Sequence, residues 1–188
     1  NNPPSNSELF TKPFIYLIEA CLIGLFEETL FRGFILQGLT KGLSVSVSVI
    51  TGSLFYAILH FFSFKVLVYT GSQPFVGFST LLHFFIPAIQ DYQLILPYII
   101  GLFIVGVVLS LSYLHTKSLY LPIGLHAGWV FGIKLNRLFL DHNHDMSTWV
   151  FGDGALVSGI FGWVFLAGVL IVIKMVIVQN RFESHVKT

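Results

Sequence analysis

The chain has 188 residues, of which 55% are hydrophobic, 16% aromatic and only 10% charged, and its mean hydropathy is +0.82. An average soluble domain carries about 25% charged residues, so this composition excludes an ordinary soluble protein and predicts an integral membrane protein in contact with lipid. The formal net charge is +1, and the clustered Lys and Arg of a phosphate-binding surface are absent, so we expect no nucleic-acid partner.

The two ends of the chain differ from its middle. Residues 1–9 are polar and contain prolines, with no signal-peptide pattern, and residues 179–188 form a second polar segment. We interpret residues 1–188 as a single integral-membrane domain with these two polar ends. Because the chain does not begin with methionine, we also expect that it is truncated or processed at its N-terminus.

Apolar stretches between the polar ends are long enough to cross a membrane. About 20 apolar residues span about 30 Å of hydrocarbon. The stretches that fit are residues 10–39, 43–62, 94–115, 119–140 and 155–178. A further segment, 66–89, is broken by prolines and is compatible with a tilted span, a re-entrant turn or an interfacial helix. We therefore predict an all-α fold, a polytopic transmembrane helical bundle of about five to six membrane helices.

The loops give the orientation in the membrane. The loop 141–154 has three aspartates and no Lys or Arg, whereas Arg181 and Lys187 follow the last helix. Excess Lys and Arg mark the cytoplasmic side, which favours a cytoplasmic C-terminus, although Lys134 and Arg137 lie near the opposite end of a helix. We expect the cytoplasmic membrane of a prokaryote.

The first candidate motif is an acidic pair in an apolar helix. Ionisable residues at membrane depth are expected to be functional. Glu28 and Arg32 are four residues apart in the acid-first order, so they can form an ion pair on one helix face. Glu27 points about 100° away and is free to face another helix as a general base. The structural alternative is that all three side chains form a buried polar cluster without a catalytic role, or that they lie at the membrane boundary.

Two histidines lie in other apolar helices. His60 follows Tyr56 by one turn, which places the phenol ring beside the imidazole; alone, such a histidine is more often a packing or interfacial residue. His126 lies beside a small-residue stripe that is expected to let membrane helices approach closely. The stripe consists of Gly124, Gly128 and Gly132. Three segments therefore each offer a polar group of the kind that water activation requires.

In this order the motifs resemble those of the CPBP family, the superfamily of type II CAAX-prenyl endopeptidases and of bacteriocin-processing or abortive-infection-like membrane proteases. Its patterns are two glutamates with an arginine four residues beyond, an aromatic residue four before a histidine, and a histidine four before Asn or Asp. The resemblance covers about residues 22–134. It implies an intramembrane endopeptidase that hydrolyses a peptide bond of a membrane-associated substrate.

The resemblance also implies roles for the residues. Glu27 and His60 would activate a water, and His126 would bind that water or the developing oxyanion. The side chains that would shape the site are Glu28, Arg32 and Tyr56. No cofactor is required by the sequence: Glu27, His60 and His126 could hold a divalent metal such as zinc with one open position, or act directly as base and electrostatic stabiliser.

One departure supports a second interpretation. Val130 stands where the family pattern has Asn or Asp, and Asn136 lies too far around the helix to replace it. Loss of one oxyanion donor typically lowers the rate by about 10²–10³. The alternative is therefore a non-catalytic subunit or scaffold of a larger membrane complex, with other membrane subunits as partners. The polar Glu27, His60 and His126 favour the protease, whose partner is a membrane-associated peptide or protein substrate.

Overall fold

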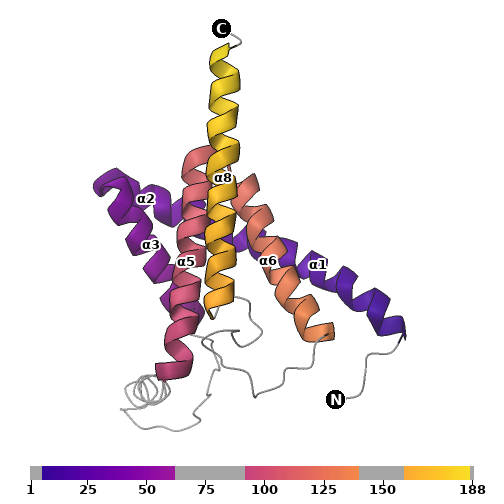
Figure 1. Ribbon diagram of the computed structural model, residues 1–188. Coiled ribbons are helices and arrows are strands. Elements are labelled where there is room, and N and C mark those ends of the chain that lie inside the picture. Colours follow the sequence, from indigo (N-terminus) through magenta and orange to yellow (C-terminus); the bar gives the residue numbers. More distant parts are fainter. Residues whose placement is uncertain (1–5, 62–91, 140–158, 187–188) are drawn as a thin grey trace, which may run out of the picture.

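The structure is a computed structural model that describes residues 6–61, 92–139 and 159–186, and every element in these residues is a helix (Figure 1). The elements are α1 (Asn6–Glu28), the π-helical segment η1 (Thr29–Leu36), α2 (Gln37–Gly42), α3 (Val45–Phe61), α5 (Tyr92–Thr116), α6 (Tyr120–Phe139) and α8 (Ile160–Val186). The all-helical class is confirmed for these residues. The segment 66–89 and the loop 141–154 lie outside them, so the orientation stays a prediction.

Two helical stretches are long and apolar enough to cross a membrane. They are Ser7–Gly42, with 36 residues, and Leu96–Thr116, with 21 residues. Val45–His60 and Gly162–Ile173 are shorter apolar helices. At about 1.5 Å per residue the first stretch is about 54 Å long, so it must tilt or extend beyond the hydrocarbon. The number of spans predicted from the sequence stays a prediction.

Helical structure continues into both segments that we expected to be polar ends. α1 begins at Asn6, inside segment 1–9, and α8 continues to Val186, inside segment 179–188. Polar residues with good helix propensity extend a helix beyond the apolar part without interrupting its backbone hydrogen bonds. Hydropathy marks where an apolar stretch ends rather than where a helix ends.

The first helical stretch contains a change of helix type. Glu28 is the last residue of α1, and η1 follows directly, with the i→i+5 hydrogen bonds of a π-helix. The Thr29 hydroxyl donates to the Leu25 carbonyl at 2.6 Å at this junction. The stretch ends at Gly42, and Leu43 has an extended backbone that leads the chain into α3. The acidic motif therefore lies at the transition between two helix types.

The helices pack in pairs around α5. α1 crosses α6, α3 packs along α5, and α6 and α8 both lie against α5 (Figure 1). The buried apolar cluster joins η1, α3, α5 and α8, and consists of Phe31, Tyr56, Ala57, Leu102, Val105, Val108, Leu109, Leu166 and Ile173. Outside it, large apolar side chains such as Phe10, Phe26 and Phe34 are exposed, as expected of surfaces that meet lipid.

Two glycines set the closest helix approaches. A Cβ at Gly24 would lie 3.0 Å from the Ile123 carbonyl oxygen, where α1 crosses α6, and a Cβ at Gly106 would lie 2.9 Å from the Ser53 Cβ, between α5 and α3. The expectation that the Gly124–Gly132 stripe allows close helix approach is wrong for Gly124 and Gly128, since a Cβ at either meets no atom within 4 Å. Residue spacing shows a stripe, but it cannot show which helix face meets a neighbour.

We predict that Gly24→Ala lowers the free energy of unfolding by about 1–3 kcal/mol, because the added methyl meets a backbone oxygen that cannot rotate away. The measurement is an SDS unfolding titration in mixed micelles. Gly38→Ala is the matched control, because a Cβ there meets nothing within 4 Å. Equal effects of the two substitutions would contradict a close crossing at Gly24.

Candidate active site

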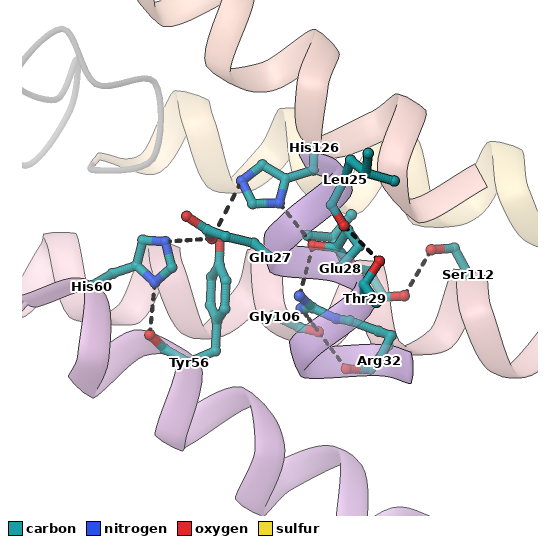
Figure 2. Close-up of polar contacts among 12 residues, drawn as sticks. Leu25, Glu27, Glu28, Thr29, Arg32, Tyr56, His60, Gly106, Ser112 and His126 are labelled. Atoms are coloured by element: carbon teal, nitrogen blue, oxygen red, sulfur yellow. Dashed lines mark hydrogen bonds and ion pairs between the residues drawn. The ribbon is translucent and has the colours of Figure 1, made fainter. Parts of the chain in front are cut away.

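All of the candidate site residues meet where the end of α1 crosses the first half of α6 and where η1 packs against α3 (Figure 2). Glu27 and Glu28 come from the last turn of α1, and Arg32 from η1. Tyr56 and His60 come from the last turns of α3. His126 comes from the first half of α6. The close crossing at Gly24, one turn before the glutamates, brings α6 near enough for His126 to reach them.

The Glu27 carboxylate faces both imidazoles. Its Oε2 lies 3.0 Å from His60 Nε2 and 3.7 Å from His126 Nε2, and Figure 2 shows the three side chains directed toward one another. The Glu27 side chain is 30% exposed, whereas His126 is only 5% exposed. The cluster is therefore covered on the α6 side and accessible on the side of Glu27 and His60.

The partners of the two Nδ1 atoms fix the hydrogen positions on the rings. His60 Nδ1 lies 3.0 Å from the Tyr56 carbonyl oxygen, and His126 Nδ1 lies 2.7 Å from Glu28 Oε1. A carbonyl or carboxylate oxygen only accepts, so each Nδ1 carries the hydrogen. Each Nε2 then faces Glu27. His60 Nε2 lies 3.0 Å from an oxygen of the Glu27 carboxylate, and such a contact needs a hydrogen between the two atoms, so the Glu27–His60 pair holds one proton. Two imidazole nitrogens and one carboxylate thus converge from three helices.

A fully buried ion pair between Glu28 and Arg32 lies next to this cluster. Arg32 Nη1 lies 2.8 Å from Glu28 Oε1, with the two side chains 2% and 0% exposed. Arg32 Nη2 donates to the Gly106 carbonyl oxygen at 3.1 Å, and the guanidinium lies 4.8 Å from the Tyr56 ring centroid. The same Glu28 oxygen accepts from both Arg32 and His126, so the ion pair and the His126 orientation depend on one carboxylate.

Tyr56 positions His60 through its backbone and its ring. Its ring centroid lies 4.0 Å from that of His60, and its carbonyl accepts the His60 Nδ1 hydrogen. Tyr56 is itself buried, between Phe31 at 4.9 Å and Arg32. An imidazole held at one nitrogen and on one ring face has little rotational freedom, which keeps its Nε2 toward Glu27.

The sequence also predicted Glu27, His60 and His126 as the ligands of a metal, if one is used. Among the described residues, no group of three or more His, Cys, Asp or Glu side chains has an arrangement that could hold a metal ion. Glu27 and His60 instead contact each other directly. The use of zinc by Glu27, His60 and His126 stays a prediction.

Other contacts at the helix crossing were not anticipated from the sequence. Lys134 of α6 forms an ion pair with Glu19 of α1, and its ammonium lies 5.3 Å from the Tyr16 ring centroid. Glu19 lacks a motif context, and Lys134 was considered only as an orientation signal. The two residues are 115 positions apart, so no local pattern predicts that they meet. The pair joins α1 to α6 beyond the Gly24 crossing.

An apolar helical bundle that encloses carboxylates, histidines and a buried arginine has the general organisation of an intramembrane hydrolase. A family model, Type II CAAX prenyl endopeptidase Rce1-like, matches residues 9–132. The chain therefore belongs to this family of CAAX protease-like intramembrane endopeptidases, as the motifs predicted, and it is an integral membrane protein. The match includes every candidate site residue. Comparisons with curated proteins and with solved structures gave no match.

We predict that Arg32→Ala lowers the free energy of unfolding by about 3–5 kcal/mol, because it leaves the Glu28 carboxylate buried without its cation. The same SDS titration measures this effect. Lys12→Ala breaks the exposed Glu8–Lys12 ion pair and serves as the control, with no measurable loss expected. If Arg32→Ala unfolds like the control, Arg32 does not stabilise the fold.

Proposed function

We propose that the chain is an intramembrane endopeptidase, which hydrolyses a peptide bond of a membrane-associated substrate with a water activated by Glu27 and His60. The observation that carries this proposal is the Glu27 carboxylate facing His60 Nε2 at 3.0 Å and His126 Nε2 at 3.7 Å. A carboxylate flanked by two oriented imidazoles is able to accept a proton and return it, as general acid–base catalysis requires.

The hydrogen positions indicate how a water would bind. Glu27 Oε2 is buried and makes no hydrogen bond of good geometry within the described residues, so it can accept one hydrogen of a water. His126 Nε2, whose lone pair faces the same region, can accept the other. The water oxygen then carries its free lone pairs toward a substrate carbonyl carbon. Both hydrogens of the nucleophile would thus have defined acceptors.

One proton of the water moves as the bonds at the substrate carbonyl carbon form and break. The water oxygen bonds to the carbonyl carbon, and its proton moves to Glu27 while His60 stabilises the protonated acid. The carbonyl oxygen becomes an oxyanion. When the C–N bond breaks, the same proton goes to the leaving amine, which restores Glu27. Glu28 accepts the His126 Nδ1 hydrogen, which keeps His126 Nε2 directed toward the attacking oxygen, whose second hydrogen it accepts.

Glu27→Ala and His60→Ala are each expected to lower the cleavage rate by about 10²–10⁴, because each removes one of the two groups that move the proton. Cleavage is measured in proteoliposomes with a fluorogenic peptide that ends in a prenylated CAAX sequence. Both variants should keep wild-type stability in the SDS titration, as should the control Glu8→Gln, which should also keep full activity. Cleavage by Glu27→Ala at the wild-type rate would show that Glu27 does not take part in the mechanism.

Removal of divalent metal is expected to leave the rate unchanged, because every step proposed above uses protein groups. The measurement compares cleavage before and after dialysis against a chelator, with zinc then added back. Loss of activity that zinc restores would instead assign Glu27, His60 and His126 as metal ligands and replace the direct mechanism.

Val130 is the observation that favours the second candidate function, a non-catalytic subunit of a membrane complex. Val130 lies one turn after His126 in α6, and its side chain cannot donate a hydrogen bond. On the protease account, Val130→Asn adds a donor beside His126 and raises the cleavage rate, by up to about 10²–10³. Val130→Thr, of nearly the same size as valine, is the control for packing. If neither the wild type nor Val130→Asn cleaves any substrate, the non-catalytic role is favoured.

A further inference from the structure

The proposed reaction places a negative charge on the substrate carbonyl oxygen, and none of its steps supplies a hydrogen-bond donor to that oxygen. Glu27 and His126 accept the two hydrogens of the water, and His60 stabilises the protonated acid. Val130 stands where the family pattern has a polar side chain, and it cannot donate. A missing oxyanion donor typically lowers the rate by about 10²–10³, so efficient cleavage needs a donor from another residue.

Among the candidate site residues, Arg32 and Tyr56 carry the donors that the proposed steps leave unused. Arg32 is only 1% exposed, and its Nη1 and Nη2 donate to Glu28 and to the Gly106 carbonyl oxygen. Its guanidinium is therefore already paired and out of reach of a substrate. Tyr56 acts in the site only through its backbone carbonyl and the face of its ring, so the role of its hydroxyl is open.

The Tyr56 ring lies beside both imidazoles. Its centroid is 4.0 Å from that of His60 and 6.2 Å from that of His126, to which it is nearly perpendicular at 80°. The same two imidazoles flank Glu27 Oε2, at 3.0 and 3.7 Å. Figure 2 shows the ring extending from α3 with its hydroxyl end toward the Glu27 carboxylate. The hydroxyl therefore lies where the water attacks.

Two further observations agree with this placement. Of the charged groups, Glu27 has the largest electrostatic effect on the Tyr56 phenol. The hydroxyl is nevertheless not bound to the catalytic oxygen, because Glu27 Oε2 has no hydrogen-bond partner among the described residues. The hydroxyl and the base thus lie near each other without being paired, as a base and an oxyanion donor must.

The surroundings of Tyr56 suit a donor. The residue is 2% exposed, with the Phe31 ring packed edge-on at 4.9 Å and the Arg32 guanidinium over its face at 4.8 Å. These contacts fix the ring. A phenol keeps its hydrogen at neutral pH, and a fixed donor shielded from water stabilises a developing negative charge without reorganisation.

We propose that Tyr56 is a catalytic residue whose hydroxyl donates a hydrogen bond to the oxyanion, the role that a polar side chain at Val130 would otherwise have. This inference rests on the proposed function, because the oxyanion forms only if a water attacks a carbonyl carbon beside Glu27. No bond to Tyr56 forms or breaks, and the phenol keeps its hydrogen throughout. The hydrogen bond acts on the transition state, so it raises kcat rather than lowering KM.

Tyr56→Phe tests the proposal, because phenylalanine keeps the ring and the backbone and removes only the hydroxyl. We expect kcat to fall by about 10²–10³ with KM within about twofold of the wild type. The assay is the cleavage of the prenylated peptide in proteoliposomes. Tyr120→Phe is the control, because this tyrosine is 88% exposed; its kcat should equal that of the wild type. Both variants should keep wild-type stability in the SDS titration.

A binding measurement separates this proposal from the proposed function. The probe is a peptide whose scissile amide is replaced by a phosphinate, so that a charged oxygen stands in for the oxyanion, and its affinity is measured by calorimetry in micelles. Tyr56→Phe should weaken its binding by about tenfold or more, whereas Tyr120→Phe should not. Unchanged kcat in folded Tyr56→Phe would overturn the proposal and leave the protease intact.

A fall in kcat with unchanged phosphinate affinity would also overturn it, because Tyr56 would then act by positioning His60. Weaker phosphinate binding by Tyr56→Phe would support the donor even if cleavage of the amide peptide is too slow to measure. A wild type that neither cleaves the peptide nor binds the phosphinate would reject the proposed function and this inference together.

Discussion

The arrangement of the whole site depends on one carboxylate oxygen. Glu28 is fully buried, and its Oε1 accepts hydrogen bonds from Arg32 at 2.8 Å and from His126 at 2.7 Å. The pair with Arg32 compensates two charges that the bundle could not otherwise bury. The hydrogen bond to His126 fixes the ring so that Nε2 faces Glu27. The stability of the fold and the geometry of the site therefore both depend on this atom. A substitution of Glu28 would change both.

The helix packing is what allows this contact. Gly24 lets α1 approach α6, and Gly106 lets α5 approach α3 while its own carbonyl oxygen accepts from Arg32. The change from α1 to η1 falls between Glu28 and Arg32. Segments of π-helix are often found at functional sites, where they alter the direction of side chains. Here Glu28 lies before this change and Arg32 after it, and the two side chains still pair.

The sequence predicted which residues form the site, but not the contacts between helices that support it. Spacing alone gave the Glu28–Arg32 pair, and the family motifs associated Glu27, His60 and His126. Nothing local indicates that the Gly106 carbonyl or Lys134 would find partners in α1 and η1, because such contacts depend on how helices cross. For the same reason the glycine stripe was assigned to a helix contact when Gly124 and Gly128 line a cavity.

The central claim is that Glu28 and the Tyr56 carbonyl accept the Nδ1 hydrogens of the two imidazoles and so hold both rings with Nε2 toward Glu27. Nitrogen-15 NMR of histidine-labelled protein in lipid bilayers tests it directly, with His60 and His126 assigned by single substitutions. The account predicts that Nδ1 of both rings carries a hydrogen. A ring with hydrogen on Nε2 and none on Nδ1 would contradict it, because that Nδ1 could not donate to the Tyr56 carbonyl or to Glu28.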